Sequence, residues 1–105
     1  MIAPHEVAHD TYKIVEGTID AHLKSHDWKK HASCNVPIQA SWRGELMQVL
    51  LEAYRRNEWH VMLVENWSEL DQDEGRMLAQ TCGSSLDRYR GMSSYIFTLP
   101  KSLAV

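Results

Sequence analysis

The chain has 105 residues, of which 44% are hydrophobic, and a formal net charge of −3 at pH 7. These values exclude two domains and a nucleic-acid binder that depends on bulk positive charge, and no apolar run is long enough to cross a membrane. The N-terminus has no signal-peptide pattern, so we expect one cytoplasmic domain over residues 1–105 that buries its core without disulfides or metals.

The first predicted element is a long helix from about His5 to Lys30. Pro4 suits its first turn, and the acidic Glu6 and Asp10 complement the positive end of the helix dipole. An apolar stripe at helical spacing should face the core. It consists of Ala8, Thr11 or Tyr12, Val15, Ile19 and His22 or Leu23, and is widened by Val7 and Ile14.

A short strand, Ser33 to Ala40, follows this helix. Pro37 places it at a sheet edge or at a position where no backbone donor is needed, because proline has no backbone N–H. Ser41 is the predicted N-cap of a second helix that ends near Asn57. The apolar positions of this helix recur with helical period: Leu46, Val49, Leu50, Ala53 and Tyr54.

Residues 59–65 (WHVMLVE) form a nearly continuous apolar run, which predicts a central strand. Ser68 is the predicted cap of a third helix over Glu69 to Gln80, and Gly83 should end it. In this helix Leu70, Met77 and Leu78 are expected to point inward.

The residues after the third helix are predicted to form a polar, flexible loop from Ser84 to Met92. A last strand, Ser94 to Leu99, ends at Pro100. Alternation along this strand places one set of side chains, Tyr95, Phe97 and Leu99, on one face, and Ile96 and Thr98 on the other.

These elements predict an α+β fold in the order α-β-α-β-(α)-β, with a three-stranded sheet and two main helices packed on one face. The order of the strands in the sheet stays open. The second face would show apolar side chains, and such a face is usually paired with something. A homodimer is the simplest way to cover it.

Residues 5–9 (HEVAH) match the H-E-x-x-H motif, in which His5 and His9 hold zinc and Glu6 deprotonates a bound water. A zinc hydrolase also needs a third protein ligand, and none follows at a diagnostic spacing. Tyr12 and Val15 occupy the glycine and histidine positions of the extended motif. The sequence therefore favours an ordinary first helical turn, with no cofactor, and keeps zinc as the alternative.

Other residues that could carry chemistry have ordinary explanations. Cys34 and Cys82 show no C-x-x-C spacing and are expected to be free thiols. A second metal group of His22, His26, His31 and Cys34 matches no standard zinc module. In the loop, Arg88, Tyr89 and Arg90 could clamp a nucleotide base, although local ion pairs account for them better. The acidic run Glu69 to Glu74 lacks the glycine of a calcium loop.

Arginines gather on the second predicted helix and tryptophans lie near its ends. Arginine and tryptophan are the residues that most often anchor protein interfaces, and arginine also pairs with acidic groups. The alternative is a solvated helix face. The predicted partner-binding residues are Arg43, Arg55, Arg56 and Trp59.

Residues 50–61 (LLEAYRRNEWHV) resemble a pattern in small accessory proteins of bacteriophages. In that pattern a helix ends in A-Y-R, a turn and a tryptophan lead into a strand, and the final strand ends in F-x-x-P, as Phe97 to Pro100 do. Glu58 stands in the turn where glycine is usual. The resemblance implies a phage-encoded protein that binds a host or virion protein. We therefore predict a non-enzymatic interaction module, with a minimal zinc hydrolase as the alternative.

Overall fold

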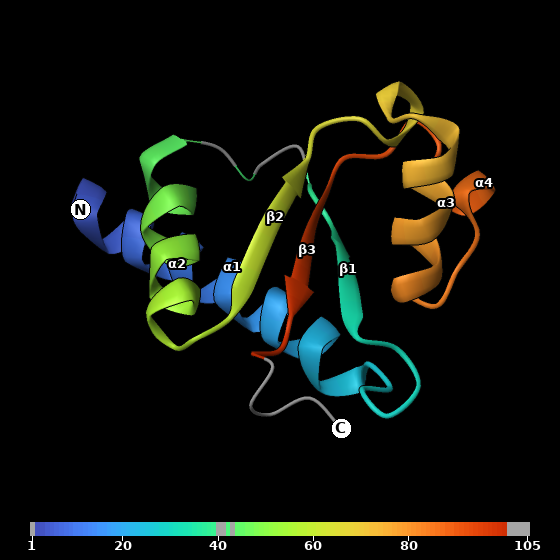
Figure 1. Ribbon diagram of the computed structural model, residues 1–105. Coiled ribbons are helices and arrows are strands. Elements are labelled where there is room, and N and C mark those ends of the chain that lie inside the picture. Colours follow the sequence, from blue (N-terminus) through green and yellow to red (C-terminus); the bar gives the residue numbers. More distant parts are fainter. Residues whose placement is uncertain (1, 40–41, 43, 101–105) are drawn as a thin grey trace.

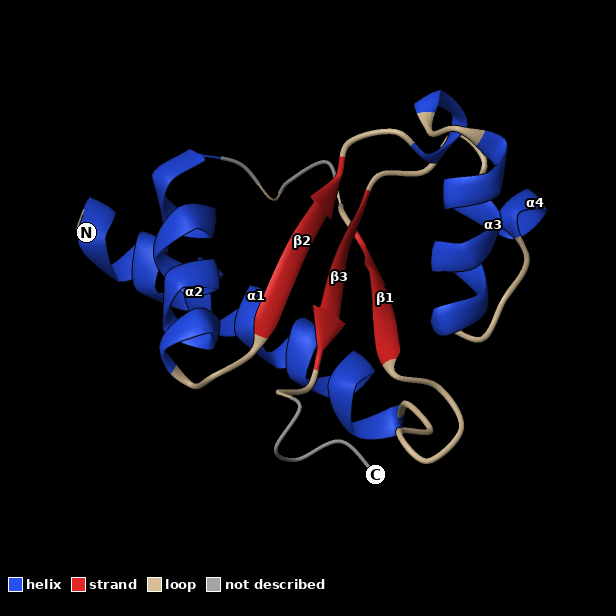
Figure 2. Cartoon of the chain, viewed as in Figure 1, coloured by secondary structure: helices blue, strands red, loops and turns tan. Residues whose placement is uncertain are grey.

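The structure, a computed structural model, describes residues 2–39, 42 and 44–100. Within these residues it contains three strands, four α-helices and one 3-10 turn (Figure 1, Figure 2). The α+β prediction is thus confirmed. In chain order the elements are α1 (Pro4–Ser25), β1 (Ser33–Pro37), α2 (Gly44–Arg56), β2 (His60–Val64), η1 (Trp67–Glu69), α3 (Gln72–Thr81), α4 (Leu86–Tyr89) and β3 (Ser94–Thr98).

The sheet has the strand order β1-β3-β2, and both pairs are antiparallel. Phe97 of β3 lies opposite Cys34 on one side and Val61 on the other. The prediction that residues 59–65 form the central strand is therefore wrong, since β3 is central and β2 is an edge strand. β1 is the other edge strand, as Pro37 predicted.

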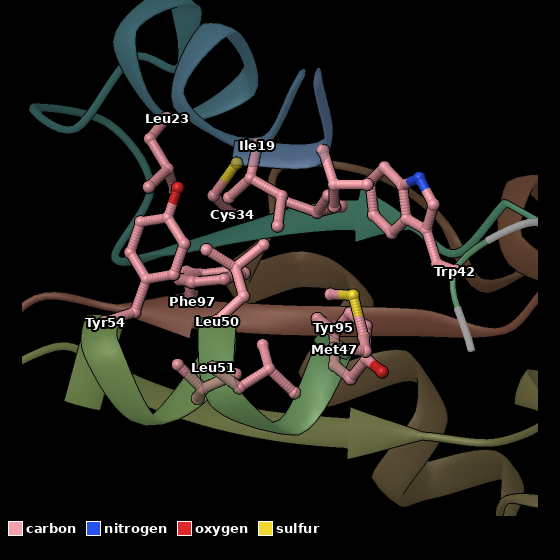
Figure 3. Packing of buried hydrophobic residues seen from close by; sticks show 13 residues of the cluster. Ile19, Leu23, Cys34, Trp42, Met47, Leu50, Leu51, Tyr54, Tyr95 and Phe97 are labelled. Atoms are coloured by element: carbon pink, nitrogen blue, oxygen red, sulfur yellow. The ribbon is translucent and has the colours of Figure 1, made fainter. Parts of the chain in front are cut away.

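One face of the sheet is covered by α1 and α2, as predicted for the two main helices. Phe97 is fully buried there, and the ring of Tyr54 meets it edge to face at a centroid distance of 5.2 Å. Figure 3 shows the side chains of both helices meeting those of the strands. The buried members of this cluster are Val15, Ile19, Leu23, Cys34, Val36, Trp42, Met47, Leu50, Leu51, Tyr54, Val61, Tyr95 and Phe97.

The other face is not left bare, because η1, α3 and α4 pack against one end of it. Val64 of β2 and Ile96 of β3 are buried there against Trp67 and Leu86. These elements do not reach the other end of β2, where Met62 is 38% exposed and His60 is exposed. The sequence predicted that this apolar face would be open, and in the described part of the chain only this end of it is exposed.

The first helix is shorter and its buried stripe narrower than predicted. It ends at Ser25 because His26 has an extended backbone and the indole of Trp28 donates to the carbonyl of Leu23 at 2.7 Å. Val7 and Ile14 were expected to widen the stripe but are exposed. The stripe consists of Val15, Ile19 and Leu23.

The third helix begins at Gln72 and not at Glu69, because residues 67–69 form the separate turn η1. Met77 is 69% exposed and does not point inward as predicted, whereas Leu70 and Leu78 are partly buried. The predicted flexible loop contains α4, whose Leu86 is buried. The predicted cap Ser41 lies outside the described residues.

Candidate protein-binding surface

The H-E-x-x-H residues lie in the first turns of α1, and all three side chains are exposed. Its glutamate already has a structural contact, since the carboxylate of Glu6 accepts a hydrogen bond from the N–H of Ala3 at 3.3 Å. In the described part of the chain, no third histidine, cysteine, aspartate or glutamate joins His5 and His9 to form a metal-binding group. The arrangement offers two exposed imidazoles on one helix face.

The second proposed metal group is likewise not brought together. A ring nitrogen of His26 lies 3.2 Å from the carbonyl oxygen of His31, and the His26 ring meets that of Trp28 edge to face. The thiol of Cys34 instead approaches the carbonyl of His22 at 3.7 Å. These side chains tie the α1–β1 connection together and do not share a common centre.

Both cysteines are free and buried. Burial raises the pKa of the Cys34 thiol to about 11 and that of Cys82 to about 11. The thiolate is the nucleophile and the metal ligand, and at neutral pH both groups stay protonated. Both side chains pack as small apolar groups.

A small polar cavity of about 170 Å³ lies between α1 and α2, with Glu16, Asp20, Tyr54 and Asn57 in its wall. The hydroxyl of Tyr54 donates to the carboxylate of Asp20 at 2.6 Å. Burial, and then this hydrogen bond, raises the pKa of Tyr54 above its usual value. The phenol therefore stays protonated and links the two helices.

The four predicted partner-binding residues have different positions. Arg55 and Arg56 are exposed on the last turn of α2. Trp59 is half-buried, with its ring 5.4 Å from that of Trp28 and 6.1 Å from that of Phe97, so it packs against the core. Arg43 lies outside the described residues.

The corner between α2 and β2 places Arg55 beside the edge strand. Glu58 has a φ of 72°, and the N–H of Trp59 donates to the carbonyl of Tyr54 while that of Glu58 donates to Arg55. This pair of bonds defines a Schellman ending, in which the left-handed residue is usually glycine. The tight corner forms although Glu58 occupies that position.

Replacing this residue with glycine should stabilise the protein. A left-handed backbone crowds any Cβ, at a cost of roughly 1 kcal/mol. We expect Glu58→Gly to raise the free energy of unfolding by about 1 kcal/mol in urea denaturation. Glu58→Ala, which keeps the Cβ, is the control and should show no such gain. A loss of stability in Glu58→Gly would contradict this account of the corner.

The edge of β2 carries two exposed apolar side chains. Met62 is 38% exposed and Leu63 48% exposed, and within the described residues β2 pairs only with β3. At its start, Arg55 donates to the carbonyl of Val61 at 3.4 Å and to the carboxylate of Glu52 at 3.4 Å. We call Arg55, Arg56, Met62 and Leu63, with the outer backbone edge of β2, the β2 edge surface.

The basic part of this surface could be predicted from the sequence, and its apolar part could not. Residues 59–65 were predicted to lie in the centre of the sheet, where both faces and both edges are covered. The hydropathy pattern of an apolar run does not distinguish an edge strand from a central strand. No sequence signal therefore marked Met62 and Leu63 as accessible.

Comparisons with known proteins identify no relative. No family model matches the chain, and neither a curated protein nor a solved structure matches it significantly. Among the described helices, none is long and apolar enough to cross a membrane.

Proposed function

We propose that this protein is a non-enzymatic interaction module that binds a larger protein through the β2 edge surface. In this proposal the partner adds an extended segment to the sheet as a strand beside β2. The observation that carries the proposal is that β2 is an apolar edge strand whose Met62 and Leu63 remain accessible to solvent.

The contrast between the two edges of the sheet supports this proposal. Proteins usually protect edge strands with proline, lysine, a bulge or a covering element, because unpaired backbone groups invite another strand. β1 follows this rule, since it contains Pro37. β2 (HVMLV) contains neither proline nor lysine, and among the described side chains Arg55 alone donates to its backbone.

The chemistry of the surface defines the segment that it would accept. Strand addition draws its affinity from main-chain hydrogen bonds and its specificity from alternate side chains. Met62 and Leu63 favour apolar side chains in the added strand. Arg55 and Arg56 favour an acidic residue at the end that lies beside them. The phage resemblance directs the search for such a partner to host and virion proteins.

Affinity capture with matched variants tests the proposal. The chain would carry a C-terminal tag, and partners would be captured from bacterial lysate with the wild type, Leu63→Lys and Met77→Lys. Lysine on an edge strand opposes strand addition, and its long stem suits a half-exposed site. Met77 is the control because it is an exposed apolar residue on α3, away from β2.

We expect a stoichiometric partner that the wild type and Met77→Lys retain and Leu63→Lys loses. Thermal melts of both variants should match the wild type, so that the loss reports the surface and not unfolding. A partner that Leu63→Lys retains in full would overturn the proposed surface. Complete absence of a captured partner from host lysate and from purified virions would overturn the proposed function.

A further inference from the structure

We infer that a second copy of this chain occupies the β2 edge surface when no other partner is bound. The two β2 strands would pair antiparallel about a two-fold axis at Met62 and join two three-stranded sheets into one of six strands. This inference rests on the proposed function, because the same edge serves both interactions, and it adds a form of regulation.

The sequence of β2 is complementary to itself in this register. With the axis at Met62, each Val61 lies opposite Leu63 of the second copy, and the two Met62 residues lie opposite each other. His60 lies opposite Val64. Directly opposed side chains share a sheet face, so apolar side chains meet on both faces and no like charges are opposed along β2.

The charges at the two ends of β2 favour the same arrangement. Arg55 contacts β2 near its start, and Glu65 follows directly after its end and is exposed. No salt bridge involves Glu65 within the described residues. Antiparallel pairing brings Glu65 of the second copy, two residues beyond Leu63, to the end of β2 where Arg55 lies. The two-fold axis makes this contact twice, whereas parallel pairing would bring the two Arg55 side chains together.

If β2 pairs with a second copy, its outer edge is accessible only in the monomer. A partner strand could then bind only the dissociated fraction, and its apparent affinity would fall as the chain becomes more concentrated. In addition, the dimer would cover the apolar edge that otherwise invites aggregation. The second copy would thus protect the surface and compete for it.

Sedimentation equilibrium over a range of loading concentrations tests the inference. We expect the wild type to pass from monomer to dimer, and Leu63→Lys to remain monomeric. Glu65→Lys places a positive charge beside Arg55 of the other copy at both contacts, so dimerisation should weaken by about ten-fold or more. Arg55→Glu should weaken it similarly, and the double variant Arg55→Glu/Glu65→Lys should recover most of the loss.

The exposed Arg76 on α3 provides the charge control, because Arg76→Glu should leave dimerisation unchanged. High salt should weaken the wild-type dimer, since exposed ion pairs are screened. A wild type that stays monomeric at every concentration would overturn the inference. So would a dimer that Leu63→Lys and Glu65→Lys leave intact, because it would use another surface.

Glu65→Lys also separates this inference from the proposed function. Glu65 acts only as the group that one copy presents to the other, so this variant should capture a larger partner at least as well as the wild type does. Capture by Glu65→Lys without wild-type dimerisation would support the function and overturn the inference. Dimerisation with no captured partner would do the reverse.

Discussion

Trp67→Ala should lower the free energy of unfolding by about 4 kcal/mol, the range measured when large buried aromatic side chains are removed. The Trp67 side chain is only 1% exposed and lies at the centre of the cluster that joins α3 and α4 to the sheet. Its indole N–H donates to the hydroxyl of Ser94 at 3.0 Å, and its ring lies 4.7 Å from that of Tyr89. Urea denaturation would measure the change.

Two further variants separate the packing of Trp67 from its hydrogen bond. Trp67→Phe keeps an aromatic ring but removes the donor, and Ser94→Ala removes the acceptor. In a double-mutant cycle we expect a coupling of roughly 1 kcal/mol between them. If Trp67→Ala costs less than 1 kcal/mol, the second cluster does not hold the helices to the sheet.

Gly83→Ala should destabilise the protein by roughly 2–3 kcal/mol, through two effects that add. Gly83 ends α3 with a φ of 82°, where any side chain is strained. A Cβ built there would also lie 2.5 Å from Cδ2 of His31. The ring of His31 would have to move, although its backbone is held by Asp27 and His26. Thermal or urea unfolding would measure the loss.

Gly91 provides a control that isolates the backbone effect. Its φ is 77°, but nothing lies within 4 Å of a Cβ built on it. Gly91→Ala should therefore cost only about 1 kcal/mol. His31→Ala should remove the clash in Gly83→Ala and bring its cost down to that of Gly91→Ala. Equal costs for the two glycine variants in the wild-type background would contradict a clash with His31.

Elements with strong periodicity or a strong stop signal could be predicted from the sequence. The apolar positions of α2 recur at helical spacing, β3 is a short apolar run that ends before Pro100, and Pro37 correctly marked an edge strand. Gly83 ends α3 as expected. These signals are local, because each depends on the conformation or hydrogen bonding of a few neighbouring residues.

Features that depend on tertiary packing could not be predicted in this way. Met77 appeared to be a core residue by spacing, yet the buried side of α3 carries Gly75 and Ala79, and Leu86 packs against Gly75. Small residues give no hydropathy signal, so the larger methionine was predicted to be the buried residue. The end of α1 was also misplaced, because the hydrogen bond from the indole of Trp28 to the carbonyl of Leu23 ends the helix and leaves no signal in the hydropathy pattern.

The candidate site was predicted only in part. Arg55 and Arg56 could be chosen by charge alone, and both side chains are exposed, as partner-binding residues must be. Trp59 was chosen by residue type, but its ring packs against Trp28 and Phe97. The exposure of Met62 and Leu63 follows from the strand order, which places β2 at an edge of the sheet. Strand order depends on pairings between residues far apart in the sequence.

The central position of β3 also determines when the sheet can form during protein synthesis. In the described part of the chain β1 and β2 pair only with β3, and β3 is the last of the three strands in chain order. Until residues 94–98 have left the ribosome, the earlier strands have no partner, and the apolar side chains that have already emerged are available to chaperones or to other nascent chains. The helices can begin to form earlier, but the sheet must assemble late and in a single step around β3.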